Sequence, residues 1–235
     1  MMRKLIALIL CLHVATSFGM ARKLNWENAV DHAIANYGLK QEPRLRALFS
    51  KAKIQYPPKD IALLAFKKEQ SIQLWAKNQS NAWKYVHTYP LTAFSGRLGP
   101  KLKESDGQIP EGIYRLTTFN PFSSFHLSMM INYPNSFDKE KGYVDGRKNL
   151  GNNIFIHGKN LSVGCLAIGD LAIDQLFILA RRVGLSNIKV IIAPNDLRKD
   201  KKPSTSTFAQ PRWLPELYKQ ISDSLKPFSN HKYSA

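Results

Sequence analysis

The sequence predicts an α+β protein: a mainly β domain with helices on its N-terminal side and one helix on its C-terminal side. Three patterns lead to this fold class. Apolar side chains recur at helical spacing in residues 22–60, short strand-like runs between turn formers fill residues 61–195, and an amphipathic repeat follows near the end of the chain. We therefore expect residues 61–195 to form one domain, on which residues 196–235 pack as a loop and a helix.

The first 21 residues have the layout of a secretory signal peptide. Two cations, Arg3 and Lys4, precede an apolar run over residues 5–18, and the small residues Gly19 and Ala21 suit cleavage. The alternative is a retained membrane anchor, but this run of about 14 residues is shorter than the roughly 20 that a spanning helix needs. We expect cleavage and a periplasmic or otherwise exported location.

Two helices are expected before the first strand. The first ends at Gly38 and the second follows it, and each carries apolar residues at helical spacing that predict packing against a core. These positions are Trp26, Val30, Ala33, Ile34 and Tyr37 in the first helix, and Leu45, Leu48 and Phe49 in the second.

Seven strands are expected in the main domain, each a run of apolar or β-branched residues bounded by turn formers. They cover residues 61–66, 72–76, 83–89, 112–117, 126–131, 153–157 and 188–193. A helix should begin at Gly169-Asp170 and run up to Gly184, and a final amphipathic helix should include Trp213 and Leu225.

The chain is strongly basic, which narrows the class of partner. Its formal net charge is +17, and it stays at +15 when the first 21 residues are removed with their two cations and no acid. No zinc-finger spacing and no glycine-aromatic RNA-binding motif is present, so we expect no nucleic acid partner. For an exported protein the expected partners are anionic surfaces of the envelope, namely wall-peptide carboxylates, wall polymers and lipid head groups.

Cysteine usage singles out one thiol. Of the two cysteines, Cys11 lies in the expected signal peptide, so the exported chain keeps only Cys165 and forms no internal disulfide. An unpaired cysteine in an oxidising compartment is either a reactive thiol or a small buried hydrophobe. The adjacent His-Gly and Ser-x-Gly favour the reactive thiol.

Cys165 is a candidate nucleophile, and His157, eight residues before it, is its candidate base. The strand that ends at His157 holds the imidazole, Gly158 permits a sharp turn, and Gly164 allows close backbone approach before the thiol. We expect the imidazole to lower the pKa of the Cys165 thiol, and the thiolate to attack a carbonyl carbon and form a thioester. The backbone N–H groups of Gly164 and Cys165 are the expected donors to the oxyanion.

The string from His157 to Cys165, H-G-x-x-x-S-x-G-C, resembles a compact form of the signature of the L,D-transpeptidases, the YkuD-type cysteine enzymes of bacterial peptidoglycan. The short loop between His-Gly and Ser-x-Gly-Cys resembles the YafK-like branch. Three further segments resemble that branch in the same order: residues 94–101 (FSGRLGPK), 106–114 (DGQIPEGIY) and 131–135 (INYPN) with Asp138. The resemblance covers roughly residues 43–228.

The resemblance implies a β-rich catalytic fold in which Cys165 is the nucleophile and His157 the base, its imidazole oriented by a backbone carbonyl. It implies peptidoglycan stem peptides as the substrate, cut at the carbonyl of the third residue's L-centre, and no cofactor. The acyl group then passes to an amine or to water. The branch also includes a hydrolase that detaches an outer-membrane lipoprotein from the wall, so a wall-anchored outer-membrane protein is a possible partner. One departure matters: most members carry arginine two residues after the cysteine, where this chain has Ala167.

Other polar residues are weaker candidates. Ser162 either contacts substrate or caps its turn, and His126 either lines the cleft or is structural. A zinc site built from His126, His157 and Cys165 matches no common ligand spacing, so no metal is expected. The remaining candidates for substrate binding, in or near the family-like segments, are Arg97, Lys101, Arg115 and Tyr133.

Three classes of function are open. We favour an acyltransferase of the wall over a hydrolase with the same dyad, such as an amidase or a carboxypeptidase, and over a wall-binding protein with an inactive dyad. Turnover of a substrate would distinguish the acyltransferase and the hydrolase from the inactive binding protein. The acyl acceptor, an amine or water, would distinguish the acyltransferase from the hydrolase. A sortase also pairs histidine with cysteine, but it needs a downstream arginine that this context does not suggest.

The signal peptide predicts a processed N-terminus near Met20 or Arg22. Intact-mass measurement of the protein recovered from an exported fraction should show it. Leu8→Arg should leave the chain unprocessed, because a charge interrupts the apolar run. Recovery of the unaltered chain from the cytoplasm with Met1 in place would contradict the prediction.

Overall fold

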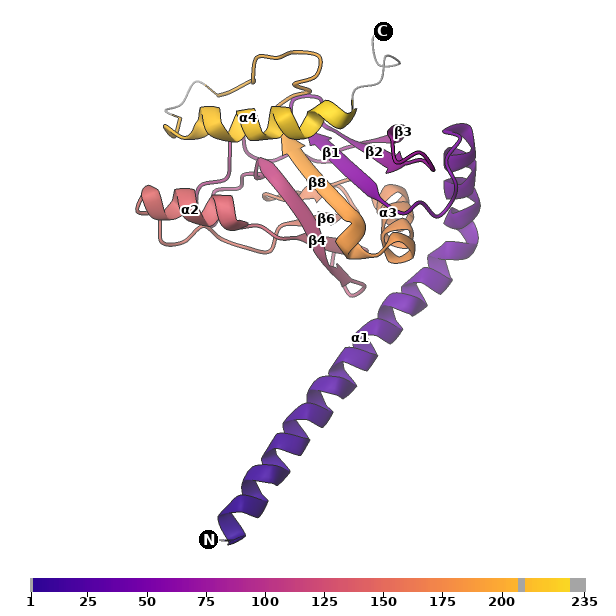
Figure 1. The fold of residues 1–235 in the computed structure, drawn as a ribbon, viewed down its shortest axis with the longest axis vertical. Helices are drawn as coiled ribbons and strands as arrows, with labels where there is room; N and C mark the ends of the chain where they lie inside the picture. The colour runs from indigo at the N-terminus through magenta and orange to yellow at the C-terminus, as the bar shows by residue number, and fades with distance from the viewer. Residues whose placement is uncertain (1, 207–209, 229–235) are drawn as a thin grey trace.

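The chain folds around one eight-stranded sheet with helices on both faces (Figure 1). The computed structural model describes residues 2–206 and 210–228. The strand order is β3-β2-β1-β8-β4-β5-β6-β7, in which the β1–β8 and β6–β7 pairs are parallel and the other pairs antiparallel. The predicted α+β class is confirmed.

The strands are short and their bounds lie close to the predicted ones. They are β1 (Ile61–Phe66), β2 (Ser71–Lys77), β3 (Trp83–Pro90), β4 (Gly112–Asn120), β5 (Ser128–Ile131), β6 (Phe155–His157), β7 (Leu166–Ala167) and β8 (Ile188–Ala193). The α-helices are α1 (Met2–Lys51), α2 (Ser136–Val144), α3 (Asp170–Val183) and α4 (Leu214–Leu225), and the 3₁₀ turns are η1 (Leu185–Asn187) and η2 (Lys226–Phe228).

The expectation of two separate N-terminal helices was wrong, because α1 continues through Gly38 and Pro43 to Lys51. Its buried residues, including Val30 and Phe49, pack on the core, and this packing outweighs the cost of about 1 kcal/mol for one glycine in a helix. The helix bends where it reaches the domain (Figure 1), as expected near an internal proline.

The predicted signal peptide lies outside the residues whose side chains the structure describes. Within the described part of the chain, no helix combines the length and the apolar character that crossing a membrane requires.

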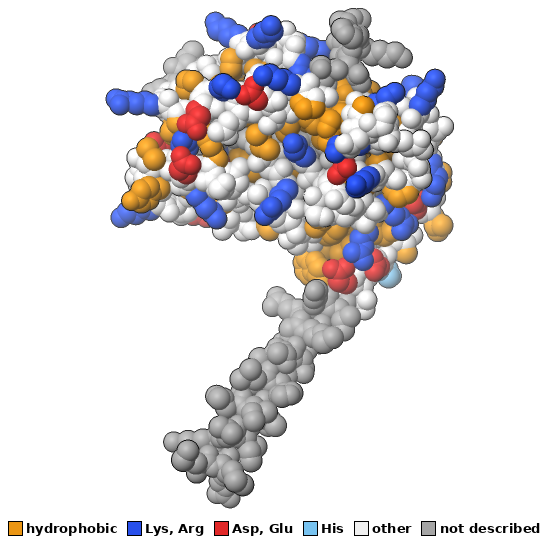
Figure 2. Space-filling view, in the orientation of Figure 1, with side chains coloured by type: hydrophobic (Ala, Val, Ile, Leu, Met, Phe, Trp, Pro, Cys, Tyr) orange, Lys and Arg blue, Asp and Glu red, His pale blue; other side chains and the backbone are white. Residues whose placement is uncertain are grey.

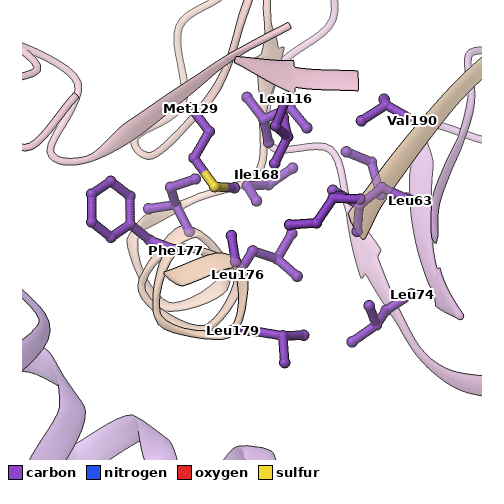
Figure 3. Close-up of a cluster of buried hydrophobic side chains, with 14 of the residues drawn as sticks. Leu63, Leu74, Leu116, Met129, Ile168, Leu176, Phe177, Leu179 and Val190 are labelled. Atoms are coloured by element: carbon purple, nitrogen blue, oxygen red, sulfur yellow. The ribbon is translucent and has the colours of Figure 1, made fainter. Parts of the chain in front are cut away.

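Alternate residues of the central strands face two different cores. Leu63 belongs to the larger core, with residues of α1, α3 and the sheet; Figure 3 shows it with Leu176 and Val190. Leu64 belongs to a smaller core on the other face, with Leu217 and other apolar residues of α4. The sheet is therefore buried on both faces, which explains why β1 is apolar at all six positions.

Three elements differ from the predicted ones. β5 begins at Ser128 rather than at residue 126, because His126 has a left-handed φ of 74° that no strand accepts. Helix α2 was missed, although the reciprocal capping bonds of Asn135 and Asp138 are a local start signal. The two residues of β7 are too few to be recognised from sequence.

A fully buried ion pair joins the sheet to the loop before β4. Lys67, directly after β1, has its Nζ 3.0 Å from Glu111 Oε1, and neither side chain is exposed. The Lys67 ammonium also donates to the carbonyls of Gly99 (2.6 Å) and Ile109 (2.9 Å). Tyr218 of α4 donates to Glu111 Oε2 at 2.9 Å. Burial lowers the pKa of Lys67, and the Glu111 carboxylate opposes that effect.

Removal of one partner of this pair should destabilise the fold strongly. Lys67→Met leaves the Glu111 charge buried and unpaired, so we expect a loss of about 3–5 kcal/mol in the free energy of unfolding, measured by urea denaturation. Lys67→Met/Glu111→Leu should lose clearly less, because no buried charge is left. Lys77→Met, whose partner Asp60 lies at the surface, is the control and should lose about 1 kcal/mol or less. Equal losses in the single and double variants would contradict the prediction.

Candidate active site

Strands β6 and β7 bring the predicted nucleophile and base to one face of the sheet. In the parallel pairing Ile156 lies opposite Leu166, and His157 lies opposite Ala167. Side chains alternate between faces along a strand, and Ile156 and Leu166 are fully buried in the core. Their neighbours His157 and Cys165 therefore share the opposite face.

That face opens into a pocket of about 520 Å³ that both side chains line. The cysteine is partly exposed and His157 is 3% exposed. The other lining residues are neutral and come from residues 120–128, 153–155 and 161–163: Asn120, Ser123, Ser124, Phe125, Ser128, Asn153, Phe155, Leu161, Ser162 and Val163.

The geometry of His157 fixes its tautomer. Its Nδ1 lies 2.7 Å from the carbonyl oxygen of Gly158. Because a carbonyl only accepts, Nδ1 carries the hydrogen and Nε2 keeps a free lone pair. The Phe125 ring packs against the His157 imidazole, with 4.7 Å between the ring centroids. Burial lowers the pKa of His157 below 6.5, and the Gly158 bond opposes this, so at neutral pH the imidazole is uncharged and basic.

The expectation of a lowered thiol pKa was wrong. Burial raises the pKa of Cys165 above its ordinary 9.0, although the Phe155 N–H bond to Sγ (3.4 Å) and the Lys101 charge lower it. Partial burial removes water from around the sulfur, so the charged thiolate is less well solvated than a free one. These two directions leave a neutral thiol beside a neutral imidazole near neutral pH.

The loop before the thiol is held by a chain of serine hydroxyls. Ser95 accepts a hydrogen bond from the Gly164 N–H (2.7 Å) and lies 3.1 Å from the Ser162 hydroxyl. Ser162 donates to the carbonyl of Cys165 at 2.7 Å. Ser162 thus holds the loop, and Ser95, which lies in a family-like segment, is a site residue that sequence reasoning missed.

This arrangement changes the expected oxyanion donors. The Gly164 N–H is occupied by Ser95, so it is not free to bind a substrate oxygen. By contrast, the Cys165 N–H has no acceptor in the part of the chain that the structure describes. In the described part of the chain, Cys165 therefore combines a thiol with a backbone N–H that bonds no other group.

The two glycines of the motif serve different needs. Gly164 has a φ of +94°, and an added Cβ would lie 3.1 Å from the Gln108 carbonyl oxygen, as the predicted close approach requires. Gly158 does not adopt a left-handed φ. It is required because a Cβ would lie 2.6 Å from Asp170 Oδ1 and 2.8 Å from the Phe125 carbonyl oxygen.

The other substrate-binding candidates lie outside the pocket. His126 Nε2 lies 2.7 Å from Asp174 Oδ1, which ties it to α3, and the Tyr133 hydroxyl donates to the Leu150 carbonyl. Lys101 pairs with Asp106 at 2.6 Å. Two further candidates are elsewhere: Arg97 lines a separate hollow of about 810 Å³, and Arg115 is exposed on β4. Among the described residues, no group of three or more potential ligands could hold a metal ion.

Residues 60–192 match the family described as the L,D-transpeptidase catalytic domain (YkuD), which is more than half of the chain. The chain belongs to this family. It is 32% identical to YafK of Escherichia coli, strains K12 and O157:H7, over 114 residues that are 48% of this chain and 44% of YafK. The match therefore spans less than half the length of these relatives.

Two solved structures are similar at lower identity. The helical cell shape determining protein Pgp2 from Campylobacter jejuni is 20% identical with a TM-score of 0.48, covering 67% of this chain and 56% of Pgp2. Bd1075 from Bdellovibrio bacteriovorus is 21% identical with a TM-score of 0.43, covering 73% of this chain and 56% of Bd1075.

Ala167, where most L,D-transpeptidases carry arginine, is fully buried in β7. Its carbonyl accepts a hydrogen bond from the Thr92 N–H (2.8 Å), and the residue bridges to Ala93. The backbone at Thr92 and Ala93, just before residues 94–101, thus covers Ala167. Besides the dyad, the polar side chains that line the pocket around the thiol are those of Asn and Ser residues.

Alkylation should reveal the neutral resting thiol of this L,D-transpeptidase-family site. In a Cys11→Ser chain, Cys165 should react with iodoacetamide more slowly than free cysteine at pH 7, with a rate midpoint above pH 9.0. His157→Ala should change this profile little, because the imidazole is uncharged at that pH. Rapid alkylation at pH 6 that His157→Ala abolishes would instead show a thiolate–imidazolium pair.

Proposed function

We propose that this chain is an exported L,D-transpeptidase-like enzyme that acts on peptidoglycan stem peptides through a thioester on Cys165. The observation that carries the proposal is the shared pocket: it is lined by His157, the last residue of β6, and by Cys165, the residue directly before the adjacent parallel strand β7. The nucleophile, a neutral base and an unpaired backbone donor therefore meet at one hollow large enough for a peptide.

The chemistry follows from the protonation states. As Sγ of Cys165 attacks the carbonyl carbon at the L-centre of the stem's third residue, Nε2 of His157 takes the thiol proton. The Cys165 N–H donates to the oxyanion of the tetrahedral intermediate. When the carbon–nitrogen bond breaks, His157 returns the proton to the leaving amine, and the acyl group stays on sulfur as a thioester.

In the second half of the reaction, the acyl group leaves the thioester and the proton transfers run in the reverse order. An acceptor amine loses its proton to His157 as it attacks the thioester carbonyl, and the sulfur leaves and recovers the proton. A new amide bond forms and the thiol is restored. We favour this transfer as the activity of the chain.

A hydrolase is the second candidate, because one observation favours it. No Lys or Arg is among the described residues that line the pocket, and Ala167 replaces the family's arginine. An arginine offers a rigid fork of donors for carboxylates and carbonyls. Without it the acceptor is held less firmly, and water competes for the thioester. A wall-anchored outer-membrane protein would then be a partner that the enzyme releases.

The location of the enzyme is part of the proposal. The apolar N-terminal run and the high positive charge support export and contact with an anionic envelope. Peptidoglycan lies in that compartment, so substrate and enzyme would meet there without any cofactor.

The deciding assay incubates the protein with a stem tetrapeptide, with and without an excess of a diamino-acid acceptor, and measures the masses of the products by mass spectrometry. Transfer should give the mass of a joined product. Cys165→Ala should abolish turnover without unfolding the protein, and His157→Ala should reduce it by about a thousandfold or more, because the dyad acts as a unit.

The other outcomes of this assay are equally distinct. Shortened stems alone, or release of lysine from wall-linked peptide, would make the chain a hydrolase. No product from either mixture, with stem peptide still bound, would make it a wall-binding protein and defeat the proposed chemistry.

A further inference from the structure

A second hollow lies on the side of the domain that α4 covers, between that helix and the loop that precedes it. Its volume is about 750 Å³, larger than that of the thiol pocket, and the two hollows share no lining residue. The site chemistry described above makes no use of it. Figure 2 shows Lys and Arg side chains spread over this face of the domain, several of them along its top, where Figure 1 places α4 and this loop.

The rim of this hollow is strongly cationic. One acid, Asp223, lines it and pairs with two of its lysines, at 2.7 Å from Lys219 and 2.6 Å from Lys226. Among the described residues, the other three cations of the rim form no ion pair, and all three are at the surface. The five cations are Lys201, Lys202, Arg212, Lys219 and Lys226, which leaves a formal excess of four positive charges.

The floor of the hollow is apolar and well packed. Leu197, Leu214 and Tyr218 line it and are nearly buried, at 5%, 5% and 6% exposure. Tyr218 is held by its hydrogen bond to the buried Glu111. Three prolines complete the wall: Pro203, Pro211 and Pro215. The hollow therefore offers a preformed surface for an apolar body beneath a ring of positive charge.

We propose that this basic groove binds the phosphate-bearing head groups of an anionic phospholipid membrane. A cluster of four to eight Lys and Arg beside an amphipathic helix is a typical recognition site for anionic lipids. A lipid head group joins a phosphate to a glycerol and acyl portion, which matches the cationic rim and the apolar floor. Wall peptides carry carboxylates together with amines and lack such an apolar portion, so they complement the groove less well.

Binding to vesicles tests this proposal on the full chain. Sedimentation with vesicles of phosphatidylethanolamine and phosphatidylglycerol should retain the protein at low salt and lose it as salt rises. Phosphatidylcholine vesicles measure the binding that all variants share, including any through the N-terminal apolar run. Lys201→Gln/Lys202→Gln/Arg212→Gln replaces three groove charges by uncharged polar side chains, and affinity for the anionic vesicles should fall about a hundredfold.

The matched control removes three exposed lysines elsewhere, by Lys59→Gln/Lys148→Gln/Lys189→Gln. It should change vesicle affinity by less than about threefold, since only charges near the membrane contribute. Equal losses in the two triple variants, or no preference for anionic over neutral vesicles, would overturn the proposal. So would retention by purified wall sacculi but not by vesicles, which would assign the groove to a wall polymer.

Soluble glycerol phosphate separates a membrane surface from a free phosphate ligand. It should compete with vesicles only at millimolar concentration, because a single head group lacks the many contacts of a surface. Competition at micromolar concentration would overturn the membrane assignment. The proposal does not rest on the thiol chemistry, and turnover of a soluble stem peptide should be the same in the groove variant and the unaltered chain.

Discussion

The buried ion pair between Lys67 and Glu111 is the interaction on which the rest of the molecule depends. It joins the end of β1 to the segment that precedes β4, and through Tyr218 it fastens α4 to the same point. Two charges without exposure to water are stable only when their remaining hydrogen-bonding groups are satisfied. The carbonyls of Gly99 and Ile109 and the N–H of Gly99 provide these bonds.

This network also fixes the loop that holds the thiol. The segment between β3 and β4 carries Ser95, which accepts from the Gly164 N–H, and Gln108, whose carbonyl packs against Gly164. Gly99 and Ile109 lie within the same segment and are bound by Lys67. The position of the Cys165 backbone thus depends on a charge pair on the opposite side of the loop, and Tyr218 extends that dependence to the basic groove.

Burial has a second consequence in the thiol pocket, where it keeps both members of the dyad neutral. It raises the pKa of Cys165 and lowers that of His157, so neither is charged at rest near neutral pH. A neutral thiol is less prone to oxidation than a thiolate. In the proposed reaction the thiol proton passes to Nε2 at the moment of attack, and the Gly158 carbonyl favours this step by holding the hydrogen on Nδ1.

The sequence by itself determined most of the strands, α3 and α4, the family, and the pair of His157 and Cys165, because periodicity and short motifs are local properties. It did not determine that α1 runs through Gly38, since packing on the core outweighs a local helix breaker. It also did not determine that Gly164 donates to Ser95, that His126 binds Asp174, or that the thiol pKa rises. These properties arise from segments distant in sequence that meet only in the folded chain, and from the exclusion of water there.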